Sequence, residues 1–185
     1  GQGKRRIRAR RGVVLATGGF AHNPKYREAF MPAPTPQYSM AADSNTGDGL
    51  MLAESVDAAM DSERHQGAGF WTPVSVTKRD DGSQGLYPHL AMDRAKPGLI
   101  AVNAAGRRFV NEAVSYHDFV EAMYRSHETA PTMPAWLICE TSFVAKYGLG
   151  AIHPETRNLS KHAANGYITV AESLDELAGK IGVDA

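Results

Sequence analysis

The chain has 185 residues, equal numbers of acidic and basic side chains, and a formal net charge of zero. A neutral chain has no global field that would attract nucleic acid or an acidic surface. No apolar run reaches the roughly 18 residues that a membrane-spanning helix needs. The hydrophobic fraction of 43% is ordinary for a globular protein, and the length allows one core, or one domain and part of another. The single cysteine, Cys139, excludes an internal disulfide framework and suits a reducing compartment, so we expect a cytoplasmic protein.

The N-terminal region begins with a cluster of basic residues within positions 4–11. No aromatic side chains are interleaved for base stacking, so we expect a solvated two-stranded ribbon with Ile7 inward rather than a nucleic-acid-binding arm. The apolar segment 13–16 follows, and we expect it to form a buried strand that ends in a Thr-Gly-Gly turn at 17–19. Glycines at such a turn let the backbone approach a ligand closely.

Two helices are predicted next. Asn23 and Pro24 are typical of an N-cap and a first helical residue, for a helix that ends near Phe30. The Thr-Gly-Asp-Gly segment at 46–49 opens a second helix. Its apolar positions suit burial against a sheet: Leu50, Leu52, Ala53 and Val56.

The second half of the chain alternates between helical and strand patterns. A turn is expected at 80–82, and a seam between domains is expected within 67–81. A hairpin is predicted from 99–102 and 108–110, with Arg108 and Glu112 fixing it. Further predictions are helices from Ser115, over 142–147 and over 173–181, and strands over 135–139 and 167–170. This alternation predicts an α/β fold, with an α+β pattern in the later part.

The two glycine motifs are candidates for contact with a cofactor. Backbone N–H groups at a helix start favour a phosphate or the electron-rich edge of a flavin, whereas Asp48 suits a sugar or ribityl hydroxyl. Alternatively, Asp48 only caps its helix and the glycines only shape loops. The candidate contacts are Ala16, Thr17, Gly18, Gly19, Thr46, Gly47 and Asp48.

Several motifs together resemble the fumarate reductase and 3-ketosteroid dehydrogenase flavoproteins. In order and spacing, the segments that carry this resemblance are 12–20, 46–49, 97–103, 106–112 and 173–184. The resemblance implies an FAD-dependent oxidoreductase, in which a Rossmann-like FAD domain is interrupted by a substrate-capping domain. It assigns residues 1–71 to the FAD domain and residues 72–185 to the capping domain.

The resemblance also implies that this chain is an internal segment. Family members carry a G-x-G-x-x-G unit upstream of the Ala-Thr-Gly-Gly turn and a further flavin-binding segment downstream. We therefore expect FAD in the full-length protein. We expect weak or no FAD binding, and no turnover, from this chain alone.

One position bears on the branch of the family. Fumarate reductases use an arginine as a proton donor to a dicarboxylate substrate. In the matching stretch this chain has Ala95 at that place and Arg94 one residue away, and a one-residue gap would restore the match. A dicarboxylate substrate therefore stays as an alternative.

Other motifs look closer to the ketosteroid dehydrogenases: 70–73, 93–98 and 111–116. In those enzymes a tyrosine after the Asn-Glu pair is the base, and Tyr116 matches it. Alternatively, Tyr116 is an ordinary core aromatic of its helix. The implied partner is a flat apolar ketone, and Trp71, Tyr87 and Met92 are candidates for an apolar wall.

Other chemistry has weaker support. The seven histidines lack the spacing of metal ligands, so no metal site is expected. Cys139 lies in an apolar segment and is expected to be a packed side chain rather than a nucleophile. A non-redox binding module that resembles a capping domain stays as a second alternative, and the oligomeric state stays open.

Overall fold

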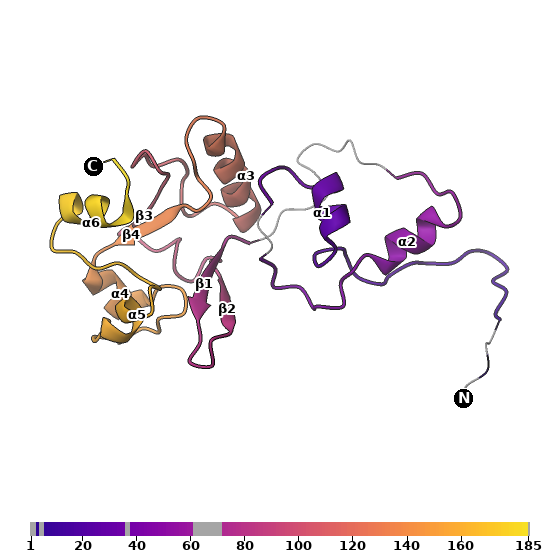
Figure 1. The fold of residues 1–185 in the computed structure, drawn as a ribbon, viewed down its shortest axis with the longest axis horizontal. Helices are drawn as coiled ribbons and strands as arrows, with labels where there is room; N and C mark the ends of the chain where they lie inside the picture. The colour runs from indigo at the N-terminus through magenta and orange to yellow at the C-terminus, as the bar shows by residue number, and fades with distance from the viewer. Residues whose placement is uncertain (1–2, 4–5, 36–37, 61–71, 185) are drawn as a thin grey trace.

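The computed structural model describes residues 3, 6–35, 38–60 and 72–184. Its helices are α1 (Pro24–Phe30), α2 (Asp48–Glu54), α3 (Tyr116–His127), α4 (Thr141–Tyr147), α5 (Ser160–Ala164) and α6 (Leu174–Ile181). Its strands are β1 (Val74–Lys78), β2 (Gln84–Pro88), β3 (Leu99–Val102) and β4 (Trp136–Cys139). Figure 1 shows an extended N-terminal part with α1 and α2, and a C-terminal body that holds all the other elements.

Helix α1 is confirmed with the predicted N-cap. The Asn23 Oδ1 atom accepts hydrogen bonds from the backbone N–H groups of Lys25 and Tyr26, at 3.1 and 3.3 Å. Helix α2 is confirmed as well, and the Tyr26 hydroxyl joins the two helices by donating to the Glu54 carboxylate at 2.8 Å. The Tyr26 ring also stacks on the Phe30 ring, with centroids 5.7 Å apart. These contacts make α1 and α2 one small packed unit.

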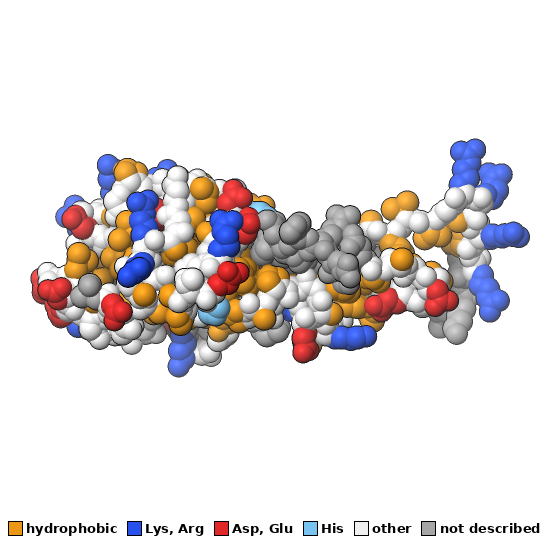
Figure 2. All heavy atoms as spheres, turned by 90° about the horizontal axis from the view of Figure 1, so that it is seen from above, with side chains coloured by type: hydrophobic (Ala, Val, Ile, Leu, Met, Phe, Trp, Pro, Cys, Tyr) orange, Lys and Arg blue, Asp and Glu red, His pale blue; other side chains and the backbone are white. Residues whose placement is uncertain are grey.

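The predicted strand at 13–16 is wrong for this structure. Residues 13–16 are not in a strand, and Val13 and Val14 are 77% and 90% exposed. Among the described residues no strand pairs with this segment, and an unpaired segment gains no ladder hydrogen bonds. The ribbon is wrong for the same reason over its described part, 6–11, where Ile7 is exposed. Figure 2 shows the basic side chains standing out from this end of the molecule.

The apolar face of α2 is also largely uncovered. Leu52 is 54% exposed and Val56, just beyond the helix, is 74% exposed. The predicted burial of these two side chains is therefore wrong, because no sheet covers them in the part of the chain that the structure describes.

The first sheet is an antiparallel hairpin of β1 and β2 that runs from the pair Val74 and Pro88 to Lys78 and Gln84. The predicted turn at 80–82 joins the strands. The Asp81 carboxylate accepts a hydrogen bond from Ser83 N at 2.9 Å, and Ser83 O accepts one from Arg79 N at 2.8 Å. Of the seam expected within 67–81, residues 67–71 lie outside the described residues.

The second sheet pairs β3 with β4 in antiparallel register, from Leu99 opposite Cys139 to Val102 opposite Trp136. The predicted hairpin is therefore only partly correct, because Val102 and Arg108 form a single bridge and no strand follows. The apolar strand β4 supplies the full ladder instead. The predicted strand at 135–139 is confirmed to within one residue.

The helices of the C-terminal body are capped as the sequence indicates. Ser115 Oγ accepts a hydrogen bond from Asp118 N at 3.1 Å, and Ser173 Oγ accepts one from Glu176 N at 3.2 Å. Helix α4 is confirmed, whereas α5 was not predicted. The buried apolar core of this body contains Leu99, Ala101, Val102, Phe119, Val120, Ala122, Phe143, Val144, Ile152 and Ala178.

The predicted strand at 167–170 is wrong, because side-chain hydrogen bonds hold this segment instead of a ladder. The Tyr167 hydroxyl lies 2.6 Å from Ser75 Oγ and accepts a hydrogen bond from Ala151 N at 2.8 Å. The two parts of the molecule also touch, since the Tyr124 hydroxyl of α3 donates to Pro34 O at 3.0 Å. None of the helices among the described residues has the length and apolar character to cross a membrane.

Candidate functional site

The two glycine motifs lie side by side in the N-terminal part. The backbone N–H of Gly47 donates to Gly19 O at 3.1 Å. The Asn23 side chain donates to Thr46 O at 2.8 Å. The turn at 16–19 and the start of α2 therefore form one continuous backbone surface, although they are far apart in sequence.

At two positions of this surface, the backbone conformation and the neighbouring side chains both favour glycine. Gly18 and Gly47 have φ angles of +82° and +86°, in the left-handed region that favours glycine. A Cβ on Gly18 would lie 2.4 Å from the Asn45 side-chain oxygen, and a Cβ on Gly47 would lie 2.7 Å from the Tyr26 ring.

Gly19 is different from these two glycines. Its φ angle is not in the left-handed region, and an added Cβ would have no heavy atom of another described residue within 4 Å. No contact among the described residues explains a glycine there. The open space in front of Gly19 is what a closely approaching ligand needs.

Asp48 does not cap its helix, so the capping role that the sequence left open for it is wrong. The N-cap of α2 is Gly47, and Asp48 is the first helical residue, without a side-chain cap. Its exposed carboxylate instead accepts a hydrogen bond from the Thr46 hydroxyl at 2.6 Å. A fixed, exposed carboxylate of this kind can accept hydrogen bonds from a hydroxyl group of a ligand.

Replacing Gly47 with Ala is expected to destabilise the unit of α1 and α2 by about 2 kcal/mol or more, because the left-handed backbone and the Tyr26 ring both oppose a Cβ. Thermal unfolding checks this effect. The matched control is Gly19→Ala, which is expected to leave the unfolding temperature unchanged. Equal unfolding temperatures for both variants would contradict the prediction.

Tyr116 is the first residue of α3, and its side chain is 48% exposed. The next apolar residues of the helix, Phe119 and Val120, are buried. Tyr116 is therefore not part of the buried core, and about half of it remains accessible once the other described residues are in place.

Arg94, one residue from the place of the fumarate reductase arginine, is 2% exposed. Its Nε donates to His89 O at 2.9 Å, and a second guanidinium nitrogen donates to Glu112 O. The guanidinium also lies over the Phe119 ring, 4.9 Å from its centroid. Arg94 is thus buried and hydrogen-bonded inside the protein, which argues against its use as a proton donor to a substrate.

The predicted pairing of Arg108 with Glu112 is confirmed. Arg108 donates to both carboxylate oxygens of Glu112, at 2.8 and 2.5 Å, and Ala101 N in β3 donates to the same carboxylate at 2.9 Å. Burial opposes ionisation of Glu112, but these hydrogen bonds outweigh it and lower the pKa of this carboxyl. The carboxylate ties the segment before Tyr116 to the sheet.

A buried pair of His89 and Asp93 was missed by sequence reasoning. His89 Nδ1 lies 2.7 Å from the Asp93 carboxylate, which also accepts hydrogen bonds from Gly150 N at 3.0 Å and Arg94 N at 2.7 Å. The spacing of four residues was the only local signal, and it lies in a loop rather than in a helix. The pair connects the loop after β2 with the loop after α4.

Other candidates take smaller roles. Burial raises the pKa of the Cys139 thiol to about 11, which agrees with a packed side chain rather than a nucleophile. Met92 is 70% exposed, Tyr87 packs against His89, and Trp71 lies outside the described residues. In the described ranges, no group of three or more His, Cys, Asp or Glu side chains could hold a metal ion.

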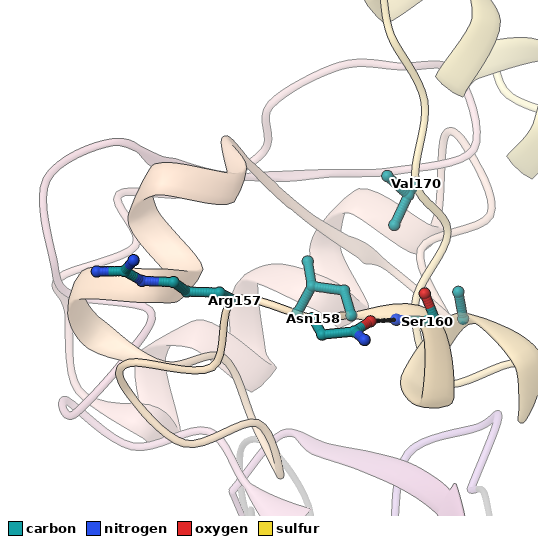
Figure 3. Close-up of a pocket in the computed structure, with 6 residues that line it drawn as sticks. Arg157, Asn158, Ser160 and Val170 are labelled. Atoms are coloured by element: carbon teal, nitrogen blue, oxygen red, sulfur yellow. Dashed lines mark hydrogen bonds between the residues drawn. The ribbon is translucent and has the colours of Figure 1, made fainter.

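A surface groove of about 460 Å³ lies beside α5 (Figure 3). Within it, Ser160 N donates to Asn158 Oδ1 at 3.0 Å. It is lined by Arg157, Asn158, Leu159, Ser160, Ala163 and Val170. None of the predicted site residues contributes to this groove.

Comparison with known proteins defines the class. Residues 1–173 match the family described as FAD binding domain, and the chain belongs to this family. It is 37% identical over 187 residues to 3-oxosteroid 1-dehydrogenase of Mycobacterium tuberculosis. This alignment covers 97% of this chain and 31% of the relative. It is 36% identical to 4-oxocyclohex-2-ene-1-carboxylate 5-dehydrogenase of Sinomonas cyclohexanicum, over 100% of this chain and 31% of the relative.

A solved structure agrees with these sequence relatives. The crystal structure of 3-ketosteroid delta1-dehydrogenase from Sterolibacterium denitrificans, in complex with 1,4-androstadiene-3,17-dione, matches with a TM-score of 0.76 and 35% identity. The match covers 95% of this chain and 31% of that chain. The mixed helix and strand fold is thus that of an FAD-dependent dehydrogenase, and the chain spans about a third of the length of its relatives.

Proposed function

We propose that this chain is a segment of an FAD-dependent dehydrogenase that acts on the carbon–carbon bond next to the ketone of a flat apolar substrate, such as a 3-ketosteroid. The observation that carries this proposal is the half-exposed Tyr116 side chain. It lies in a chain that is similar, over 97% or more of its length, to a 3-oxosteroid 1-dehydrogenase and a 4-oxocyclohex-2-ene-1-carboxylate 5-dehydrogenase. A site for an apolar ketone needs few charged groups.

In this proposal Tyr116 takes the proton from the carbon next to the substrate ketone. FAD, when bound, would supply the acceptor for the hydride that leaves the neighbouring β carbon as the carbon–carbon double bond forms. A phenol loses a proton reluctantly near neutral pH, so the base needs a neighbouring hydroxyl or cation. The family resemblance implies that other tyrosines and a backbone donor come from outside this chain. Tyr116 therefore contributes one part of a larger site.

The residues proposed to hold FAD are Ala16, Thr17, Gly18, Gly19, Thr46, Gly47 and Asp48. Three observations support their fit to the cofactor. The two glycine motifs are joined by a hydrogen bond, the backbone at Gly19 is open, and the exposed Asp48 carboxylate can accept from a hydroxyl group. We propose that they form one wall of the FAD pocket.

We further propose a division of the chain into residues 1–71, from a Rossmann-like FAD domain, and residues 72–185, from a substrate-capping domain. The proposed boundary, between residues 71 and 72, comes directly after the segment 61–71, which lies outside the described residues. The extended N-terminal part and the C-terminal body of Figure 1 support this division.

A dicarboxylate substrate is disfavoured by one observation. The arginine that a fumarate reductase would use corresponds to Ala95 or Arg94, and the Arg94 guanidinium is buried and engaged with His89 O and Glu112 O. A non-redox binding module is the remaining alternative, and adding FAD to the protein distinguishes it.

The full-length protein is expected to be purified yellow, and its flavin absorbance is expected to bleach when a 3-ketosteroid is added without oxygen. Succinate at the same concentration is expected to leave the absorbance unchanged. If the full-length protein is colourless and does not bind added FAD, the result favours the non-redox binding module. Bleaching by succinate alone would favour the dicarboxylate alternative.

The present chain serves as the comparison for cofactor binding. Titrated with FAD, it is expected to show no shift of the visible flavin spectrum and no rise in melting temperature, because it offers only one wall of the pocket. Tight FAD binding by this chain would contradict that expectation.

A further inference from the structure

Arg94 contacts the chain on both sides of Tyr116. Its guanidinium donates to Glu112 O, four residues before Tyr116, and lies over the ring of Phe119, three residues after it. The Nε atom is directed elsewhere, to His89 O at 2.9 Å. One buried side chain therefore connects the loop before α3, the first turn of α3 and the loop after β2.

The surroundings of Arg94 hold it in place. Burial lowers the pKa of Arg94, and the charge of Asp93 opposes that effect. Arg94 N itself donates to the Asp93 carboxylate at 2.7 Å. The Phe119 ring also packs edge-on against Phe109, with centroids 5.7 Å apart.

We propose that Arg94 is a positioning residue for Tyr116, which it fixes through Glu112 O and the Phe119 ring. This inference rests on the proposed function only in its catalytic consequence, because the contacts themselves belong to the fold. A guanidinium presents several N–H groups in a rigid plane, which suits two carbonyl oxygens in different loops and a ring face at once. An ammonium group cannot reproduce this arrangement.

The first experiment measures the order of the Tyr116 ring in this chain. The protein is labelled with 3-fluorotyrosine. The ¹⁹F resonance of Tyr116 is the one that is missing from the spectrum of Tyr116→Phe. In Arg94→Lys we expect the Tyr116 resonance to broaden or to move toward the denatured-state shift. The resonance of Tyr26, in the N-terminal part, is expected to stay in place.

Two further variants separate positioning from general stability. Phe119→Leu keeps an apolar side chain and removes only the ring face, and it is expected to shift the Tyr116 resonance in the same direction. Arg125→Lys, at an exposed ion pair with Glu121 on the same helix, is the matched control and is expected to shift nothing. An unchanged Tyr116 resonance in Arg94→Lys would overturn the proposal. A shift of the Tyr147 resonance in both Arg94→Lys and Phe119→Leu would also overturn the proposal, because it would indicate general unfolding.

The second experiment tests the catalytic consequence in the full-length enzyme. Arg94→Lys is expected to lower kcat about tenfold or more with little change in KM, because small misplacement of a reacting group costs rate rather than binding. In a Tyr116→Phe background the same change is expected to have little further effect. Additive effects of the two changes would overturn the proposal. Full activity of Tyr116→Phe alone would instead refute the proposed function and leave the resonance result standing.

Discussion

Tyr116→Phe in the full-length protein is expected to lower kcat by about 10²- to 10⁴-fold, the usual contribution of a positioned general base. The substitution keeps the ring and removes only the hydroxyl, so the helix start and the neighbouring core are preserved. Tyr116 is half exposed and has no role in the buried core. The melting temperature is therefore expected to stay within the error of the wild-type value.

Steady-state turnover of a 3-ketosteroid, with the flavin content of each preparation measured, checks this prediction. The matched control is Tyr147→Phe in α4, a change of the same chemistry at a residue that packs against Phe143. Wild-type turnover of Tyr116→Phe would move the base to another residue. A loss that Tyr147→Phe shares would indicate a general effect of removing a hydroxyl.

Asp93→Asn is expected to destabilise the folded chain by about 3 kcal/mol at pH 7, because it weakens three hydrogen bonds to a buried carboxylate. The Asp93 carboxylate is 2% exposed and accepts from His89 Nδ1, Gly150 N and Arg94 N. An amide in its place offers one oxygen and puts two unwanted donors into a buried site.

The same variant is expected to change the dependence of stability on pH. Burial opposes ionisation of Asp93, but the hydrogen bond and charge of His89, with the bonds from Gly150 N and Arg94 N, outweigh it and lower the pKa of this carboxyl. A pKa that is lower in the folded state contributes stability above the unfolded-state value of about 3.9. That stability is lost as the pH falls through the folded-state value.

Urea unfolding between pH 7 and pH 3 measures both effects. The free energy of unfolding of the wild type is expected to fall more steeply below pH 4 than that of Asp93→Asn. The control is Asp80→Asn, which removes only an exposed ion pair with Lys161 and is expected to cost less than about 1 kcal/mol. Parallel pH profiles for Asp93→Asn and the wild type would contradict the assigned role of this carboxylate.

Local features of the fold could be predicted from the sequence because their causes are local. Asn23, Ser115 and Ser173 accept hydrogen bonds from N–H groups two or three residues away, so each cap is contained in a short segment. The turn at 80–82 is of the same kind. The pairing of Arg108 with Glu112 could also be predicted from its spacing.

Features that depend on distant partners could not be predicted in this way. Strand β3 pairs with β4, and no local pattern distinguishes that partner from the nearer segment 108–110. The Asp93 carboxylate accepts from Gly150 N, and Tyr167 contacts Ser75, across long stretches of sequence. The candidate cofactor residues were grouped by their two glycine motifs, whereas the hydrogen bond from Gly47 to Gly19 required the structure.

The exposed segment at 13–15 affects how the chain behaves in concentrated solution. It is rich in β-branched residues, it is extended, and none of the described residues pairs with its backbone. Such a segment is a template for intermolecular strand pairing. The arginines at 6, 8, 10 and 11 place like charges beside it on every copy, and charged residues that flank an apolar segment oppose aggregation. Because dissolved salt screens those charges, high ionic strength removes this protection against self-association.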